Sequence, residues 1–452
     1  MSSLAVDSPS ALETGADDAT AAAFDAAAVA RSVRHAQRRL GAVDGTTRRR
    51  VLEQLGALLA SREDEILAAN AADLEAADAV DLAAPLRGRL ALSPAKLVTL
   101  REGIAQLAAM DDPVGRAVRR TELDDGLELE QVTSPLGVLL IIFESRPDAV
   151  IQIGSLALRA GDGVILKGGS EALQSNRVLV ACLRDALTAE GLDADAVVGV
   201  EGRDAVQALL DEDESIDLVI PRGSGQLVRS IQASTRIPVL GHAEGVCHLY
   251  LHAEADPAMA ARLAVDGKTS YPSACNATET LLVHRDFVPR LGPVLEALRD
   301  SEVTLRADDA VRAAWPALDL DAASADDAGT EFGDLTLTVL TVDDLDAAID
   351  HVHRHGSAHT DAICTADEAV AESFLRRVDS ASVFWNASTR FADGYRYGLG
   401  AEVGVATGRI HARGPVGVDG LLTTRWLLRG HGQRTTDYGP GRRAYTHRPL
   451  DT

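Results

Sequence analysis

The sequence predicts an α/β protein in which parallel strands are covered by helices on both faces. The main observation is that short apolar segments alternate with longer helical segments between residues 138 and 220. A second alternating region starts near His248. Strands that alternate with helices are typical of parallel sheets, and strands buried on both faces are apolar throughout. At 452 residues the chain is long enough for two or three domains.

Local patterns justify each element in turn. Residues 21–109 carry apolar side chains at helical spacing, so we expect a layer of helices before the sheet. Alternation around Asp125 and Gly126 predicts a β-hairpin over residues 121–134. The predicted elements then follow as strand 138–143, helix 149–160, strand 163–167, helix 171–189 and strand 218–220. Residues 1–20 lack apolar periodicity, so we expect a mobile tail.

The composition is strongly acidic and poor in lysine. The chain has 44 basic and 68 acidic residues, a formal net charge of −24, and only Lys96, Lys167 and Lys268 are lysines. Such a negative field repels nucleic acid and anionic membranes, so we expect neither as a partner. An acidic surface with few lysines is typical of adaptation to molar salt, where charge repulsion is screened, so we expect a halophilic protein.

Cysteine and histidine usage indicates a protein of the reducing cytoplasm without a metal. The four cysteines are widely spaced and form no CxxC pair, so neither a zinc site nor a disulfide framework is expected. The histidines His248, His252 and His411 are not spaced as metal ligands. No apolar run of about 18 residues and no basic segment before an apolar N-terminal core occurs, so we expect neither a membrane span nor a signal peptide.

One cysteine lies where a reactive thiol is expected. Cys275 is surrounded by polar and turn-forming residues in the segment 268–280, just before an apolar run. A nucleophilic cysteine must be partly exposed and near groups that favour the thiolate, whereas inert cysteines lie among apolar neighbours. The alternative is that Cys275 is a small, half-buried loop residue.

Two glycine-rich turns are candidates for nucleotide binding, although no GxGxxG motif follows a strand. Gly168, Gly169 and Ser170 follow the predicted strand that ends at Lys167. The second turn begins at Arg222 and continues through Gly223, Ser224 and Gly225 to the start of a helix. Ligands of open α/β sheets bind at the carboxyl ends of strands, and helix N-termini attract phosphates. Each turn alone is also compatible with a tight connection that binds nothing.

Several motifs together resemble those of the gamma-glutamyl phosphate reductase family, which belongs to the aldehyde dehydrogenase superfamily. They are PLGVLLIIFESRP at 135–147, ILKGGSEA at 165–172, IPRGSG at 220–225, SACNATETLLV at 273–283 and NASTRFADG at 386–394. Segments 397–404 and 411–415 fit the same pattern. The resemblance implies an aldehyde-dehydrogenase-like fold, with a Rossmann-type cofactor domain, an α/β catalytic domain and a small β oligomerisation element. It also implies reduction of L-glutamate 5-phosphate by NADPH to L-glutamate 5-semialdehyde and phosphate, the second step of proline biosynthesis.

In the implied mechanism, Cys275 attacks the acyl phosphate, phosphate leaves, and hydride reduces the resulting thioester. Asn276 and the backbone N–H of Cys275 would assist at the reacting carbonyl. Ser145 falls where related aldehyde dehydrogenases carry an asparagine that donates to the oxyanion. Because a serine replaces that asparagine here, the residue that supplies the side-chain donor of the oxyanion hole is not assigned.

The resemblance also assigns the cofactor. Lys167 is similar to the superfamily lysine that reaches the adenosine ribose, and Glu331 is similar to the acid that binds the nicotinamide ribose. Ser170 stands where members that prefer NAD often place a glutamate. Without that carboxylate, a 2′-phosphate is not repelled, so NADPH is the expected cofactor.

The substrate carries a carboxylate, an ammonium group and a phosphate, so the site needs cations. Within the motifs, the cations are Arg146, Lys268 and Arg390, and the neutral donors are Asn276, Asn386, Ser388 and Thr389. The sequence does not assign which cation meets the phosphate.

We expect a cofactor domain at 21–250, a catalytic domain at 251–415 and a C-terminal segment at 416–452 that joins the hairpin as an oligomerisation element. A homo-oligomer is expected by analogy, and the upstream glutamate 5-kinase is a candidate partner. Three alternatives remain open: another acyl or aldehyde dehydrogenase of the same fold, a cysteine acyltransferase or hydrolase that uses no nicotinamide, and a catalytically silent binding or scaffold protein.

Overall fold

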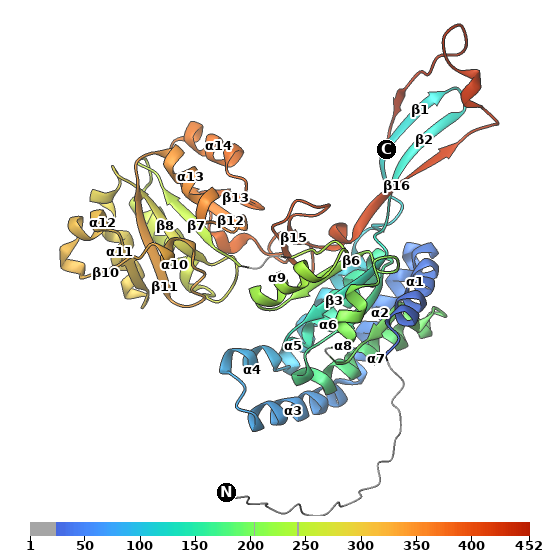
Figure 1. Ribbon diagram of the computed structural model, residues 1–452, viewed down its shortest axis with the longest axis horizontal. Coiled ribbons are helices and arrows are strands. Elements are labelled where there is room, and N and C mark those ends of the chain that lie inside the picture. Colours follow the sequence, from blue (N-terminus) through green and yellow to red (C-terminus); the bar gives the residue numbers. More distant parts are fainter. Residues whose placement is uncertain (1–23, 203, 242–243) are drawn as a thin grey trace, which may run out of the picture.

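The computed structural model describes residues 24–202, 204–241 and 244–452 (Figure 1). The longer helices are α1 (Ala26–Ala42), α2 (Gly45–Ser61), α3 (Glu63–Ala79), α5 (Pro94–Ala109), α6 (Asp148–Ala160), α7 (Leu173–Ala189), α9 (Gly225–Ser234), α10 (Pro257–Thr269), α13 (Leu345–His355) and α14 (Glu368–Arg377). The shorter helices are α4 (Ala84–Leu90), α8 (Asp204–Leu210), α11 (Gly292–Asp300) and α12 (Asp309–Ala314). The expected mobile tail, residues 1–20, lies outside the described residues.

The strands form two parallel sheets, a small antiparallel pair and an antiparallel arm. The strands before residue 250 are β1 (Ala117–Asp124), β2 (Leu127–Pro135), β3 (Val138–Phe143), β4 (Gly163–Lys167), β5 (Val197–Gly199), β6 (Leu218–Arg222) and β7 (Cys247–Leu251). The next are β8 (Thr278–His284), β9 (Thr304–Ala307), β10 (Asp321–Ala322), β11 (Thr336–Val342), β12 (Thr360–Cys364) and β13 (Ser382–Trp385). The last are β14 (Gly404–Ala406), β15 (Gly414–Val416), β16 (Leu422–Arg429) and β17 (Arg448–Leu450).

The first parallel sheet has the order β5-β4-β3-β6 and is covered on both faces, as predicted. Leu139 and Ile141 of β3 pack in a core with α2, α5, α6 and α7. The alternate residues Leu140 and Ile142 pack in a second core with α1, α8 and α9. The prediction omitted β5 and α8, because a strand of three residues is too short to show a pattern.

The second parallel sheet has the order β10-β9-β11-β8-β7-β12-β13. Helices α10 and α11 cover one face, and α13 and α14 cover the other. Because β7 begins at Cys247, the junction expected at about 250 falls inside a strand. Val403 and Ala406, which were expected in the unit 251–415, pack in the core of the first sheet because the chain returns there after β13. The assignment of the units as cofactor and catalytic domains stays a prediction.

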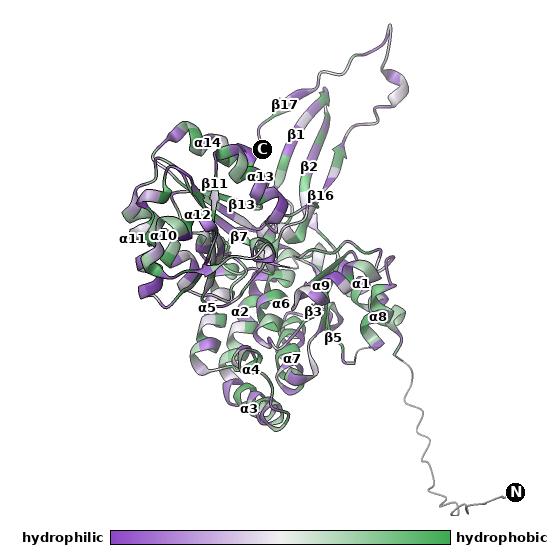
Figure 2. Ribbon diagram, turned by 60° about the vertical axis from the view of Figure 1, so that its left-hand side comes forward, coloured by the Kyte–Doolittle hydropathy of each residue, from purple (hydrophilic) through white to green (hydrophobic). Residues whose placement is uncertain are grey.

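The predicted hairpin is present and is part of a four-stranded arm of order β16-β2-β1-β17. Asp124 pairs with Leu127 across the turn, where Gly126 takes a φ of +67° that favours glycine. The arm extends away from both parallel sheets (Figure 1), and its strands β1 and β2 carry both hydrophobic and hydrophilic residues (Figure 2). In the described ranges, no helix is both long and apolar enough to cross a bilayer.

Candidate active site

A cleft of about 1030 Å³ is lined by residues of both parallel units and contains Cys275. The first unit contributes the ends of β3 and β6, and the second contributes the turn before β8 and the segment after β13. Its charged lining residues are Arg89, Lys96, Glu102, Glu144, Arg146, Asp148, Arg222, Glu331, Arg390, Asp393 and Glu402. The carboxyl ends of parallel strands therefore converge on one thiol, which is where α/β sheets bind ligands.

Cys275 differs from the other three cysteines in its exposure. It is partly exposed in the turn between α10 and β8, whereas Cys182, Cys247 and Cys364 are buried. Desolvation by burial raises the pKa of all three buried thiols, that of Cys364 to about 12. Because only the thiolate is a good nucleophile, the three buried thiols are poor candidates, and Cys275 is the candidate nucleophile.

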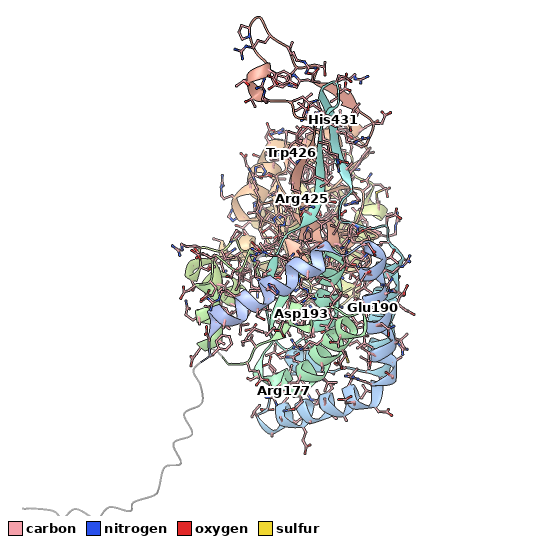
Figure 3. The ribbon with its side chains drawn as sticks, turned by 90° about the vertical axis from the view of Figure 1, so that its right-hand side faces the viewer. Arg177, Glu190, Asp193, Arg425, Trp426 and His431 are labelled. Atoms are coloured by element: carbon pink, nitrogen blue, oxygen red, sulfur yellow. The ribbon has the colours of Figure 1, made fainter. Side chains whose placement is uncertain are left out.

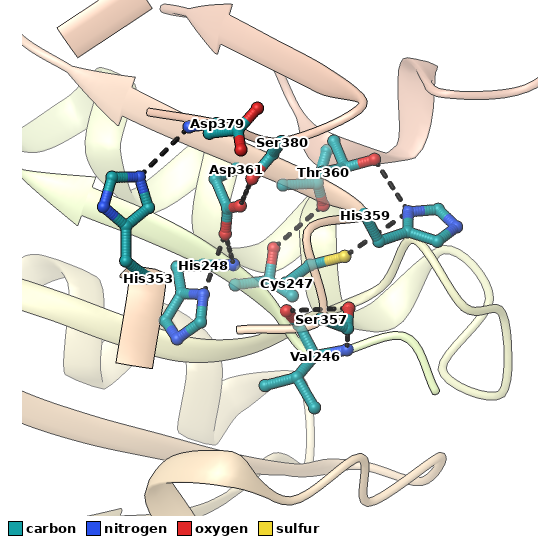
Figure 4. Close-up of polar contacts among 12 residues, drawn as sticks. Val246, Cys247, His248, His353, Ser357, His359, Thr360, Asp361, Asp379 and Ser380 are labelled. Carbon is teal, nitrogen blue, oxygen red and sulfur yellow. Dashed lines mark hydrogen bonds and ion pairs between the residues drawn. The ribbon is translucent and has the colours of Figure 1, made fainter. Parts of the chain in front are cut away.

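The start of β7 fixes the backbone of Cys275 from behind. The Cys247 thiol donates to the Cys275 carbonyl oxygen over 3.3 Å. The Val246 N–H donates to Ser357 Oγ at 2.9 Å, and the His248 ring Nδ1 lies 2.8 Å from Asp361 Oδ1 (Figure 4). These contacts join β7 to β12 and to the loop before β12. The turn that carries Cys275 therefore packs against a strand that is itself held in place.

Gly245 makes the closest approach to the thiol turn. A Cβ at this buried position would collide with the backbone carbonyl and Cα of Cys275. The Gly245 N–H also donates to Glu331 Oε2 at 2.9 Å. Only glycine at position 245 therefore allows the segment before β7 to contact both the turn of Cys275 and Glu331.

We expect Gly245→Ala to lower turnover by about 100-fold, because displacing a reacting group by about 1 Å costs that much. It should also lower the free energy of unfolding by about 1–3 kcal/mol, the usual cost of overpacking. Steady-state kinetics and denaturant unfolding measure the two effects. Gly56→Ala, inside α2, is the matched control, since a Cβ there meets nothing closer than the Ile104 side chain at 4.0 Å. Full activity of Gly245→Ala would contradict the close contact.

Lys268, which was expected to bind substrate, is not among the residues that line the cleft, and that role stays a prediction. Its Nζ donates to Glu279 Oε2 at 2.6 Å, and both side chains are completely buried. Desolvation raises the pKa of Glu279 to about 7, although Lys268 opposes this shift. Glu279 Oε1 accepts from the Gly333 N–H at 3.5 Å, next to Glu331. The pair therefore connects α10, the thiol strand β8 and the loop that carries Glu331.

Three of the four predicted neutral donors also serve the protein interior. Asn386 bonds both the N–H and the carbonyl of Thr365, at 3.0 and 2.9 Å. Ser388 Oγ accepts from the Arg390 N–H at 3.3 Å, and Thr389 Oγ1 lies 3.0 Å from Thr278 Oγ1. These side chains shape the segment after β13 and are not among the cleft-lining residues, so their assignment as substrate donors stays a prediction.

Asn276 lines the cleft, whereas Ser145 does not. The Asn276 Nδ2 donates to the Ala392 carbonyl at 2.8 Å, and its buried Oδ1 has no partner among the described residues. Ser145 is 3% exposed and donates from Oγ to Glu171 Oε1 at 2.7 Å. Its φ of +47° turns the chain between β3 and α6. The structure thus places Ser145 in the turn at the edge of the sheet, bonded to Glu171, and its role as an oxyanion donor stays a prediction.

The two glycine turns lie at the carboxyl edge of the first sheet, after β4 and β6. Ser170 is exposed there, and Lys167 is half-buried at the end of β4. The N–H of Ser224, at the start of α9, donates to Glu144 Oε2 at 3.1 Å. The exposed Ser170, Lys167 and the backbone of the glycine turns are groups that fit a dinucleotide at this edge. However, the N–H of Ser224, which caps α9, already has a carboxylate partner.

Arg146, Arg222 and Arg390 all line the cleft. Arg146 pairs with Asp148 at 3.3 Å. Arg390, only 8% exposed, donates from Nε to Ser270 Oγ at 3.0 Å. Arg222 was expected to bind cofactor, but its side chain lies in the cleft against Gly404.

Glu402 is a cleft residue to which the sequence assigned no role. Its Oε2 accepts from the Gly394 N–H at 2.7 Å, and desolvation raises its pKa. The motif at 397–404 contains this acid, but its burial beside arginines depends on packing that the sequence does not show.

Known proteins resemble this chain over nearly its whole length. The profile of the aldehyde dehydrogenase family matches residues 2–315. The gamma-glutamyl phosphate reductase of Prochlorococcus marinus (strain MIT 9303) is 49% identical, over 93% of this chain and 96% of that protein. The delta-1-pyrroline-5-carboxylate synthase 1 of Oryza sativa subsp. japonica is 49% identical over 93% of this chain, which spans only 58% of that protein. A crystal structure of gamma-glutamyl phosphate reductase from Thermotoga maritima superposes with a TM-score of 0.88 at 33% identity, over 91% of this chain and all of that one.

Proposed function

The chain belongs to the gamma-glutamyl phosphate reductase family of the aldehyde dehydrogenases, and we propose that it reduces L-glutamate 5-phosphate with NADPH to L-glutamate 5-semialdehyde and phosphate. This is the second step of proline biosynthesis from glutamate. The observation that carries the proposal is the single partly exposed thiol, Cys275, in a cleft lined with arginines. An acyl phosphate with a carboxylate needs both a nucleophile and cations.

In the proposed reaction, Cys275 Sγ forms a bond to the C5 carbonyl carbon, and the bond from that carbon to the phosphate oxygen breaks. The electron pair leaves with phosphate. Bound NADPH supplies the hydride that reduces the thioester, after which the carbon–sulfur bond breaks and the thiolate returns. The Cys275 backbone and Asn276 lie beside the carbonyl oxygen as donors. Lys167, Ser170, the turn from Arg222 to Gly225, and Glu331 were the residues expected to hold the cofactor, and all except Arg222 keep that proposed role.

The reverse reaction tests this function. We expect NADPH to form from glutamate 5-semialdehyde and NADP⁺ only when inorganic phosphate is present for continuous turnover. Absorbance of NADPH in molar KCl measures the rate. Sustained turnover without phosphate would instead indicate a hydrolytic aldehyde dehydrogenase, and other aldehydes turned over equally well would indicate a different acyl substrate.

The preference for NADPH depends on the absence of a carboxylate at position 170. Ser170 is exposed at the edge beyond β4, where a glutamate would repel a 2′-phosphate. We therefore expect Ser170→Glu to raise the Kd of NADP⁺ about tenfold and to change that of NAD⁺ little. Calorimetric titration of each cofactor measures this directly. Ser61→Glu, an exposed serine at the end of α2, is the matched control; equal effects of both substitutions would contradict the assignment.

We also propose that the enzyme works in the cytoplasm at high salt. All four cysteines are free, which fits a reducing compartment. The net charge of −24 destabilises the folded chain by self-repulsion, and at molar salt the Debye length falls to about 3 Å, which screens this repulsion. Both the melting temperature and the activity should therefore fall as KCl is removed. A melting curve that does not depend on salt would contradict this.

The arm supports a proposed homo-oligomer. Trp426 and Leu428 on its outer strand β16 are 51% and 58% exposed, and Arg425 lies beside them (Figure 3). Within the described chain, β16 pairs only with β2, so its other edge can pair with a second subunit. A monomer by light scattering in molar salt would contradict this. The upstream glutamate 5-kinase stays a proposed partner, because its acyl phosphate product is labile and benefits from direct transfer.

A further inference from the structure

The end of β6 places a guanidinium in the reaction cleft. Arg222 pairs through its backbone with Phe143 of β3, and its carbonyl accepts from the Glu144 N–H at 3.1 Å. Its side chain rests on Gly404, where a Cβ would collide with Nη1. The residue therefore lines the same cleft as Cys275.

Arg222 is not neutralised by an ion pair. Within residues 24–202, 204–241 and 244–452, no carboxylate lies within 4.0 Å of its guanidinium, whereas Arg146 has Asp148 at 3.3 Å. Desolvation lowers the pKa of Arg222, Arg146 acts in the same direction, and the charges of Glu402 and Cys275 oppose them. A half-buried guanidinium that lines the cleft without a carboxylate partner, in a chain with 24 excess negative charges, indicates a site for an anion from outside the protein.

The reaction limits where that anion lies. The phosphate is bonded through one oxygen to the carbon that Cys275 attacks, so the cation that receives it must be near the thiol. Arg390 is also near, but its Nε is held by Ser270 and it faces the ring of Tyr271 at 5.8 Å. The N–H of Ser224, which would accompany Arg222 in a pyrophosphate site, is bonded to Glu144.

We propose that Arg222 binds the phosphate group of the acyl phosphate and holds it as it leaves, rather than binding the cofactor. This rests on the proposed function. As Sγ bonds to the carbonyl carbon and the carbon–oxygen bond breaks, the electron pair moves onto phosphate, and the planar fork of Arg222 donates N–H groups to the oxygens that gain charge. No proton needs to be transferred to Arg222 or from it. In the reverse direction, the same fork orients inorganic phosphate toward the thioester.

The test uses Arg222→Gln and Arg222→Lys in the reverse direction, with Arg229→Gln as the matched control. Arg229 lies on α9, is 58% exposed and pairs with Glu244 outside this cleft. Without phosphate, the wild type should release one NADPH per active site and stop at the thioester. Arg222→Gln should keep that single burst and the Kd of NADP⁺, while its KM for inorganic phosphate rises at least tenfold. Arg222→Lys keeps the charge but loses the fork, so it should show a smaller rise.

An unchanged KM for phosphate in Arg222→Gln would overturn the assignment. A raised Kd of NADP⁺ with a normal KM for phosphate would also overturn it, because Arg222 would then bind the cofactor. A burst missing only from the Arg222 variants would also overturn the assignment, because Arg222 would then be needed to form the thioester, before phosphate reacts. A burst missing from the wild type would overturn the proposed function itself. Circular dichroism establishes that each variant is folded.

Discussion

Cys275→Ala is expected to lower phosphate-dependent turnover by roughly 10⁵-fold or more, a loss comparable to that seen when other covalent nucleophiles are removed. The alanine variant has no atom that can form the thioester, and the backbone donors and arginines of the cleft cannot replace that bond. Folding should change little, because Cys275 is partly exposed and its side chain fills no core. Reverse-direction kinetics and thermal unfolding measure the two effects.

Cys364→Ala is the matched control for this prediction. Cys364 is buried in the core of the second sheet, where burial holds its thiol in the protonated form. We expect this variant to lose some stability from the small cavity and to keep its activity. If Cys275→Ala kept a tenth of the wild-type activity while Cys364→Ala lost it, the nucleophile would be assigned to the wrong thiol.

Lys268→Met is expected to lower the free energy of unfolding by about 3–5 kcal/mol, because it leaves the buried carboxylate of Glu279 without its cation. Activity should fall as well, since Glu279 also holds the loop next to Glu331. Urea unfolding in molar KCl measures the loss. Arg312→Met removes a comparable pair with Asp309 from the surface and should change stability by less than about 1 kcal/mol.

The cost of Lys268→Met should depend on pH in a defined direction. Burial already raises the pKa of Glu279 from 4.5 to about 7, so the folded state binds the proton more tightly than the unfolded state. Removing Lys268 takes away a charge that lowers this pKa. Relative to the wild type, the variant should therefore be least destabilised below about pH 7, where Glu279 is protonated in both folded proteins, and increasingly destabilised as the pH rises above 7.

The double variant Lys268→Met/Glu279→Leu separates a charge effect from a packing effect. With both charges removed, most of the lost stability should return, because apolar groups often replace buried ion pairs without net cost. A double variant as unstable as Lys268→Met alone would mean that packing, not the unpaired carboxylate, causes the loss.

The sequence predicted the fold well where the pattern was long and apolar. The helical layer, the Asp125-Gly126 hairpin and the strand-helix alternation from β3 to β6 are confirmed. The return of residues 403–416 to the first core was missed, because such a contact joins segments far apart in sequence and leaves no local period. The resemblance in motifs supplied the family, which the comparisons then established.

The candidate site was harder to predict than the fold. Of the residues that the motifs singled out, Arg146, Glu331, Arg390 and the Arg222 turn line the cleft that contains Cys275. They could not separate residues that face this cleft from residues that support it, because both kinds are polar. Lys268 shows this most clearly, since a rare lysine in a motif can bind substrate or pair with a buried acid. Its complete burial against Glu279 is what favours the second of these roles.

The most direct test of the central claim is the mass of the enzyme after a single turnover without phosphate. Protein mixed with glutamate 5-semialdehyde and NADP⁺ is quenched in acid, which protonates the substrate amine and slows its attack on the thioester. We predict a mass increase of one glutamyl group on the peptide that contains Cys275, equal in amount to the NADPH released and absent from Cys275→Ala. NADPH release without this adduct, or an adduct on another residue, would contradict catalysis through a Cys275 thioester.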